Sequence, residues 1–306
     1  MALLIHCLMV VLLTAGSLSP VFAQAAPDTS ALVQKGRRLV ADGEFAEGLA
    51  LYEQALTAQP GLADAHLAAG IVLDLMGRYA EARRHLTQAI EHAPPELKAN
   101  TLNAMGTSYA FERRTGDAAA FFQQVYDLEQ GAGRPGGAAA AANALGRLYL
   151  ETSDVTRARQ WYQTGYEMAR RQPDEPASQL MLWELRWLHA QGRIAARAND
   201  GASARRHVNA ARQLVATTPA LKDEGPTVAY LAGYVALYTD DVATARAELA
   251  RADQRDPFNL MLQAEAAEKA GDKATAQGFW EKILTLNGHG LQHALSRPVA
   301  QKKTMR

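Results

Sequence analysis

Apolar residues recur along most of this chain at intervals of three and four positions. Leu180, Trp183 and Trp187 follow this spacing, and so do Leu145 and Tyr149. On an α-helix the spacing places the apolar side chains in one stripe on one face. No stretch of the sequence calls for a β-strand. The pattern therefore predicts an all-α protein in which each helix buries its stripe against neighbouring helices.

Small residues interrupt the apolar faces at a regular spacing. Gly70 is followed by Ala82, Leu86 and Ala89, which lie 12, 16 and 19 positions later. A small residue on a helix face marks a place where another helix approaches too closely for a larger side chain. The same template fits seven segments, which start from Gly36, Gly70, Gly106, Gly146, Gly192, Gly233 and Ala264.

Turn-forming residues divide these segments. Gly43, Gly77 and Gly271 separate a first helix from a second, and prolines such as Pro60 and Pro94 close the unit. One helix pair has too little core to be stable alone, so neighbouring pairs must stack. The predicted units lie near residues 29–62, 63–96, 99–132, 139–172, 185–218, 226–256 and 257–288.

These features resemble the tetratricopeptide repeat family, whose unit is a pair of antiparallel helices in about 34 residues. Gly36 and Gly70 are 34 positions apart, whereas the later spacings run from 31 to 46. The extra residues are expected in turns between units, at 131–137, 173–176 and 219–226. The resemblance implies a right-handed α-solenoid of seven helix pairs within residues 24–290, with the first helix of each pair on the concave wall.

The first 25 residues contain no Asp, Glu, Lys or Arg and carry the apolar run 8–13. They end in small side chains before Gln24, which is typical of a cleaved secretory signal. We therefore expect residues 1–23 to be a signal peptide and the protein to be exported, either periplasmic or secreted, without a membrane span after cleavage. The alternative is an uncleaved N-terminal membrane anchor, although the apolar run is shorter than the ~18 to 20 residues of a span.

The composition excludes several kinds of chemistry. Lys and Arg together number 32, as do Asp and Glu, and this balance is not that of a dedicated nucleic-acid binder. The only cysteine is Cys7, so the mature chain has no disulfide, thiolate nucleophile or cysteine metal site. The sequence motifs of metalloproteases, phosphate-binding loops and serine hydrolases are absent. We therefore expect a non-enzymatic protein without catalytic residues, cofactor or metal.

Three local features have both a functional and a structural interpretation. His289 and His293 lie four positions apart and could share a metal ion, but no carboxylate is near them in the sequence, which favours an ordinary polar helix. The basic C-terminal tail, residues 291–306, is expected to fray, with a contact to anionic lipid or a partner as the alternative. The four tryptophans fall at core spacings, and a ligand platform is their alternative role.

The resemblance also implies binding residues on the concave wall, at positions about three before, one after and five after each small residue. These candidates are Arg37, Asn103, Thr107, Phe111, Asn143, Arg147, Glu151, His189, Arg193, Arg197, Tyr230, Tyr234 and Tyr238. Asparagine amides can pair with the N–H and C=O groups of an extended peptide, and arginines bind carboxylates or phosphates. The tyrosines offer flat apolar area with a hydroxyl at its edge. Alternatively, some of these side chains point into the core or into water.

The function expected from these features is that of a non-enzymatic scaffold or adaptor in the periplasm or envelope. It binds a partner protein or an extended peptide in the concave groove and serves a machine for envelope assembly, secretion or export. The alternative is an accessory subunit that holds an enzyme or a carbohydrate polymer through the groove tyrosines. A clamp for chaperone tails is not expected, because Val33 and Arg37 stand where that variant of the family carries lysine and asparagine.

Overall fold

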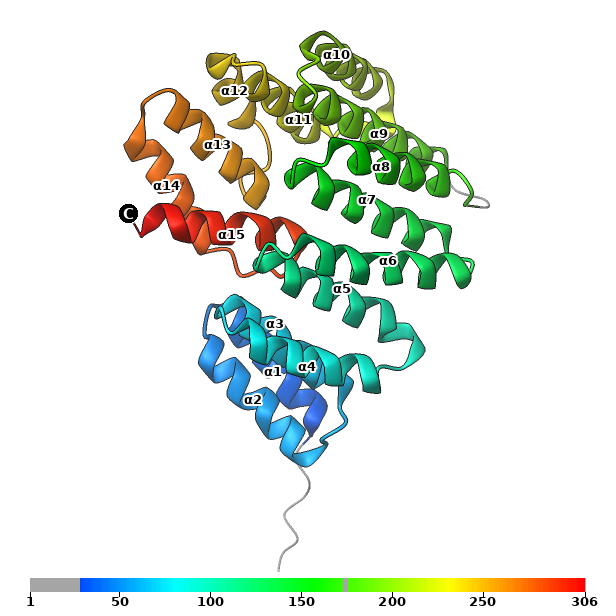
Figure 1. Cartoon of the computed structure of the whole chain (residues 1–306), viewed down its shortest axis with the longest axis vertical. Coiled ribbons are helices and arrows are strands. Elements are labelled where there is room, and N and C mark those ends of the chain that lie inside the picture. Colours follow the sequence, from blue (N-terminus) through cyan, green and yellow to red (C-terminus); the bar gives the residue numbers. More distant parts are fainter. Residues whose placement is uncertain (1–27, 173–175, 306) are drawn as a thin grey trace, which may run out of the picture.

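The computed structural model describes residues 28–172 and 176–305. These residues form fifteen α-helices and one short 3-10 helix, and none of them is in a β-strand (Figure 1). The prediction of an all-α solenoid is therefore confirmed. The predicted signal peptide, residues 1–23, lies outside the described part of the chain. Among the described helices, none is both long enough and apolar enough to cross a bilayer.

Fourteen of the helices form seven pairs, and a single helix follows them. The pairs are α1 (Thr29–Ala41) with α2 (Phe45–Ala58), α3 (Ala63–Leu75) with α4 (Tyr79–His92), α5 (Pro95–Phe111) with α6 (Thr115–Gly131), α7 (Pro135–Glu151) with α8 (Val155–Ala169), α9 (Ala177–Arg197) with α10 (Gly201–Thr217), α11 (Gly225–Tyr238) with α12 (Val242–Leu249), and α13 (Pro257–Lys269) with α14 (Lys273–Leu284). The 3-10 helix is Pro219–Leu221, and the last helix is α15 (Leu291–Thr304).

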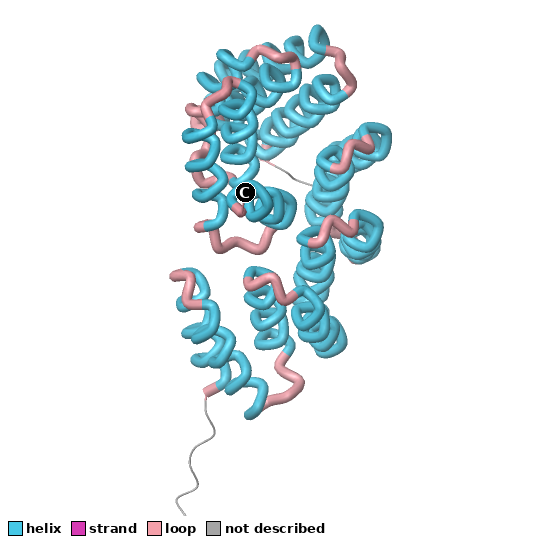
Figure 2. The backbone as a smooth tube through the Cα atoms, turned by 60° about the vertical axis from the view of Figure 1, so that its left-hand side comes forward, coloured by secondary structure: helices cyan, strands magenta, loops and turns pink. Residues whose placement is uncertain are grey.

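The first helices of the pairs form the inner layer of a curved stack. Besides packing on its own partner, α3 contacts α1 and α5, and α11 contacts α9 and α13. In two views the stack bends so that its last pairs return toward its middle (Figures 1 and 2). Side chains on the inner faces of the first helices therefore converge on one enclosed side of the molecule.

The recurring small residues lie where the two helices of a pair approach most closely. A Cβ atom built on Gly70 would lie 2.6 Å from the side chain of Leu86, which is closer than real carbon atoms come. The same holds for the pairs Gly36–Tyr52, Gly106–Phe122, Gly146–Tyr162 and Gly233–Leu249. Gly192 differs, because its nearest neighbour is Leu231 of the following unit, at 3.0 Å. The interpretation of the glycines as close-contact points is thus confirmed within five of the seven pairs.

Three units begin earlier than predicted, because their first helices are longer. The third of the seven begins at Pro95 instead of near residue 99. The fourth unit begins at Pro135, inside the segment 131–137 that the sequence assigns to a turn. Proline suits the first position of a helix, since its missing N–H would have no partner there. The fifth unit begins at Ala177 instead of near residue 185, which makes α9 21 residues long. This extension adds two turns to the inner layer.

The C-terminal segment forms a packed helix, so the prediction of a frayed tail is wrong for the described residues 291–305. Helix α15 packs against α14 and against the inner helices α5 and α13 (Figure 2). Leu295 and Ala300 are buried in these contacts. The guanidinium of Arg297 donates to the backbone carbonyl of Leu284 at 3.0 Å, which satisfies an unpaired group at the end of α14. Burial and this cap explain why the tail is ordered.

The turn before α15 reaches the first repeats of the stack. His289 Nε2 lies 2.8 Å from Asp74 Oδ2, although the two residues are 215 positions apart. The side-chain amide of Asn287 donates to the carbonyl oxygen of Ala41 at 3.3 Å. Asp74 is fully buried and also accepts from the hydroxyl of Ser108 at 2.8 Å. The C-terminal segment therefore ties the last pair of the solenoid to its first half.

Candidate functional site

Helix α15 and the turn before it cover the inner wall of the first units. Thr107 and Phe111, both predicted to line a groove on α5, are 1% and 2% exposed. The ring of Phe111 lies 5.5 Å from the ring of His289, and the hydroxyl of Thr107 donates to the backbone of Asn103. These two side chains are packed inside the protein and do not face a groove in this structure.

Asn103 and Arg37 lie at the surface, away from the other candidates. Asn103 is exposed and lines a separate hollow with Asn100 and Glu129, which shares Ala140 with the cavity described below. Arg37, on α1, forms an ion pair with Asp64 of the following unit. Neither residue belongs to the enclosed part of the inner wall.

The other nine predicted residues come together on the inner faces of α7, α9 and α11. They are Asn143, Arg147 and Glu151 on α7, His189, Arg193 and Arg197 on α9, and Tyr230, Tyr234 and Tyr238 on α11. Within each helix they are four positions apart, so each set forms a row along one face. Arginines of the α7 and α9 rows donate hydrogen bonds to hydroxyls of the tyrosine row on α11.

Arg147 connects α7 with α11 and α13. Its Nη2 donates to the hydroxyl of Tyr230 at 2.6 Å, and its Nε lies 2.9 Å from Oε1 of Glu151. The guanidinium also lies 3.7 Å from the ring centroid of Phe258 on α13, a favourable contact between a cation and an aromatic face. Arg147 is therefore held in place by three elements and is already paired with a carboxylate.

The tyrosine row forms a packed layer. Tyr230 and Tyr234 are 6% and 1% exposed, and burial raises the pKa of both hydroxyls. Arg197 donates to the hydroxyls of Tyr238 and Tyr234 at 3.2 and 3.4 Å, and to Ser153 Oγ at 2.8 Å. The hydroxyls are thus used inside the protein, and the row offers no open aromatic surface.

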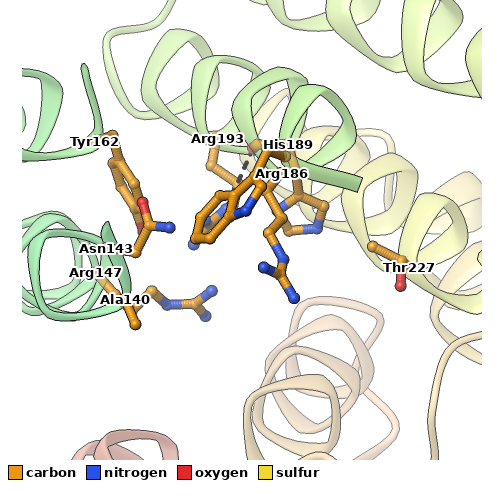
Figure 3. A pocket seen from close by; sticks show the side chains of 9 residues that line it. Ala140, Asn143, Arg147, Tyr162, Arg186, His189, Arg193 and Thr227 are labelled. Atoms are coloured by element: carbon orange, nitrogen blue, oxygen red, sulfur yellow. Dashed lines mark hydrogen bonds between the residues drawn. The ribbon is translucent and has the colours of Figure 1, made fainter. Parts of the chain in front are cut away.

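A cavity of about 490 Å³ lies between α7, α9 and α11 (Figure 3). Four predicted residues line it, namely Asn143, Arg147, His189 and Arg193. Five further lining residues were not predicted, namely Ala140, Tyr162, Trp183, Arg186 and Thr227. Figure 3 shows the labelled side chains of α7 and α9 reaching toward one another across this space.

The unpredicted residues of α9 follow the same helical spacing as the predicted ones. Arg186 and Trp183 lie three and six positions before His189. Arg186 was not predicted because the template places its first wall position three before the small residue of the unit, at His189. Trp183 precedes the predicted unit and had a ligand platform only as its alternative role. Tyr162 lies 16 positions after Gly146, where the template predicts packing within the pair; its ring does pack on Gly146, and the residue also lines the cavity.

The charged side chains that line the cavity are all arginines, and one of them, Arg147, is paired with Glu151. The others are Arg186 and Arg193, and no lining residue is an aspartate or a glutamate. Burial, together with the charges of Arg193 and Arg147, holds the pKa of the His189 ring well below its usual range. The imidazole is therefore uncharged at neutral pH, and the positive charge comes from the arginines alone.

Over residues 28–172 and 176–305, no group of three or more His, Cys, Asp or Glu side chains is placed to hold a metal ion. His289 bonds with Asp74, as described above. Burial, with His289 and Arg297 nearby, lowers the pKa of His293 to about 4. The two histidines therefore act in the packing of the C-terminal segment.

Comparison with protein families identifies the repeats. Residues 39–104 and 103–176 match two family models, both described as tetratricopeptide repeat. Residues 39–176 of the chain therefore carry tetratricopeptide repeats. Repeat scaffolds of this kind present extended concave surfaces to protein partners. A comparison of the sequence with curated proteins gave no match.

Three solved structures share the fold. A tetratricopeptide repeat protein from Parabacteroides merdae ATCC 43184 is 14% identical, with a TM-score of 0.54 over 91% of this chain and 99% of that one. The apo form of RapI is 12% identical, with a TM-score of 0.60 over 91% and 99%. Aspartyl phosphate phosphatase F from Bacillus subtilis is 10% identical, with a TM-score of 0.61 over 87% and 71%. At these identities the likeness is one of fold alone.

Proposed function

We propose that this protein is a non-enzymatic scaffold or adaptor that is exported to the periplasm or envelope and binds a partner protein or an extended peptide. The binding surface is the inner wall formed by α7, α9 and α11. The partner belongs to a machine for envelope assembly, secretion or export. Export rests on the charge-free, apolar N-terminal segment that ends before Gln24.

The observation that carries this proposal is the polar, hollowed stretch of inner wall that α15 does not line. In the first units the C-terminal segment occupies the inner side and buries Phe111. No residue of α15 lines the cavity between α7, α9 and α11. Asn143 and Thr227 are partly exposed there, and the Asn143 amide can bond with both the N–H and the C=O groups of a peptide backbone. The chain thus leaves one polar part of its concave wall free for a partner.

The carbohydrate alternative has no support in the described part of the chain. It depended on an open ladder of three tyrosines. Tyr230 and Tyr234 are buried, and their hydroxyls accept hydrogen bonds from arginines. A peptide or protein partner is therefore the proposal we retain.

The test is site-specific crosslinking in the cells from which the protein comes. A photoreactive benzophenone amino acid replaces Asn143 in one version and Gln163, an exposed residue of the second helix α8, in a matched control. We expect a discrete crosslinked protein from position 143 and none from position 163, with the mature chain starting at Gln24 in the periplasmic fraction. Crosslinks from Gln163 alone, or from neither position, contradict the proposed surface, and recovery from the cytoplasm contradicts export.

A further inference from the structure

Arg193 is a buried cation, and one of its nitrogens has no partner in the described protein. The residue is 5% exposed, and its Nη1 makes no hydrogen bond. Its Nε donates to the carbonyl oxygen of His189 at 3.3 Å, which is a long bond. A guanidinium stays charged in proteins, so its burial without an ion pair costs stability. An anion within the cavity would remove this cost.

Tyr162, which lines the same cavity, carries a second buried donor without a partner in the described part of the chain. It is 4% exposed, and its hydroxyl is buried without a partner among the described residues. The guanidinium of Arg193 lies 5.2 Å from the centroid of its ring. Figure 3 shows the two side chains on neighbouring walls of the cavity. Nearly all buried polar groups of native proteins have a partner, so two without one at the same place indicate where ligand atoms bind.

Three carboxylates lie close enough for their charges to act on the cavity arginines, and each of them has another partner. Glu151 pairs with Arg147. Asp256 accepts from the backbone N–H of Phe258 at 3.0 Å, where it caps α13. Glu224 accepts from the hydroxyl of Thr227 at 2.6 Å. The charge of Arg193 is therefore not matched by an ion pair in the described chain.

The rest of the cavity suits carbon atoms. Ala140 and Trp183 form apolar parts of the lining, and the guanidinium of Arg186 lies 4.6 Å from the ring centroid of Trp183. The volume of about 490 Å³ falls within the range of small-molecule sites, roughly 300 to 1,000 Å³. A carboxylate or phosphate group alone fills only part of this space. A ligand that fills it has a carbon skeleton beside its anionic group.

We infer that the cavity binds a small organic anion, with its carboxylate or phosphate group on Arg193 and Tyr162 and its carbon skeleton against Trp183. Forked guanidinium donors bind both groups in a bidentate manner. Because Arg193 and Tyr162 lie at buried positions, the site admits a small molecule more readily than the backbone of an extended peptide. The cavity shares Asn143 and Thr227 with the wall proposed for the partner, whereas the contacts assigned to the anion are those of Arg193, Tyr162 and Trp183.

The experiment measures binding and thermal unfolding of the purified protein with three probes: phenyl phosphate, benzoate and inorganic phosphate. We expect phenyl phosphate or benzoate to bind saturably and to raise the melting temperature, with the tighter of the two identifying the anionic group. Inorganic phosphate should bind at least tenfold more weakly, because it leaves the wall at Trp183 uncovered. Ligand binding to the folded state alone accounts for the rise in melting temperature.

Two variants and a control test the assigned residues. Arg193→Met should lose binding by more than tenfold and should raise the melting temperature of the ligand-free protein, since it removes a buried unpaired cation. Tyr162→Phe removes a single hydroxyl and should weaken binding by up to about tenfold. Arg159→Met removes one charge from an exposed position of α8 and should bind like the unmodified protein.

Several outcomes would overturn the inference. It fails if neither aromatic anion binds saturably, or if Arg193→Met binds as tightly as Arg159→Met. It also fails if a capped acidic tripeptide binds more tightly than both aromatic anions, because the cavity would then serve the protein partner. Should Arg193→Met not fold, unchanged binding by Tyr162→Phe would be sufficient to reject the site. Partner crosslinking from position 143 is a separate result and can succeed or fail independently.

Discussion

At the scale of single residues, one backbone conformation recurs in the turn inside every helix pair. Gly43, Gly77 and Gly271 adopt positive φ angles in three of these turns. The other four turns use Arg113, Ser153, Asn199 and Asp240, with φ between 56° and 69°. A side chain in this left-handed region costs roughly 1–2 kcal/mol, although Asn and Asp tolerate it better. Arg113 and Ser153 therefore carry local backbone strain.

We expect Arg113→Gly to stabilise the protein by about 0.5–1 kcal/mol. Glycine relieves the strain at φ 56°, and the higher entropy of the unfolded chain offsets part of the gain. Urea unfolding followed by circular dichroism measures the change. Gly77→Ala is the opposite control: a Cβ there meets no atom within 4 Å, so its expected loss of about 1 kcal/mol reflects the backbone alone. Equal stability of the two variants would rule out this explanation.

In three turns the sequence marks the positive φ angle by a glycine, whereas the turns at Arg113 and Ser153 carry no such residue. Gly43, Gly77 and Gly271 stand out because glycine is the usual residue for a positive φ. Arg113 and Ser153 give no such signal, since neither residue favours the left-handed region. Their turns were found only from the repeat spacing. The conformation there is imposed by the packing of the helices on both sides.

At the scale of elements, α15 is the helix whose role the sequence did not reveal. It has small or polar residues at most positions, and Pro298 lies inside it. Most of its residues favour a helix, but a proline in the helix interior costs about 3 kcal/mol, so α15 is weak by itself. The inner faces of α5 and α13 and the end of α14 supply its stabilising contacts. Truncating one of its few large buried side chains should therefore lower the free energy of unfolding of the protein.

Leu295→Ala should destabilise the protein by about 2–4 kcal/mol. Leu295 is 3% exposed in the described structure, and its truncation leaves a cavity that neighbouring helices only partly refill. Urea unfolding measures the loss, and amide exchange of α5 and α13 should become faster. Lys302→Ala, at an exposed position of the same helix, should change stability by less than about 0.5 kcal/mol. If α15 were a loose tail, both substitutions would be silent.

At the scale of the whole molecule, the curvature of the stack brings acidic groups of distant helices close to one another. Glu265 lies on α13 and is largely buried on the inner side. Burial, with the negative charges of Glu151 and Glu268, raises its pKa to about 7. The folded protein therefore holds a proton on Glu265 between about pH 4.5 and 7, whereas the unfolded chain releases it. Stability contributed at this site is present at low pH and is lost as the pH rises through 7.

Glu265→Gln should remove this loss. The amide is uncharged at every pH, so the variant should gain stability over the unmodified protein as the pH rises from 5 to 8. The gain should reach about 1–3 kcal/mol above pH 7. Urea midpoints of both proteins across this range give the difference. Glu281→Gln, an exposed position of α14, controls for the loss of one charge. A difference that stays constant with pH would show that Glu265 is already ionised in the folded state.

The sequence by itself determined the helix pairs and their order. Helical periodicity is a local feature of the sequence. The contact of a glycine with a large side chain is nearly as local, because Gly70 and Leu86, like Gly106 and Phe122, are 16 positions apart. Only the tertiary structure decided what occupies the concave side, because that depends on the summed curvature of seven pairs. This curvature brings His289 to Asp74 and leaves Arg193 and Tyr162 around a cavity. No local pattern encodes these contacts, since small rotations between units accumulate along the whole stack.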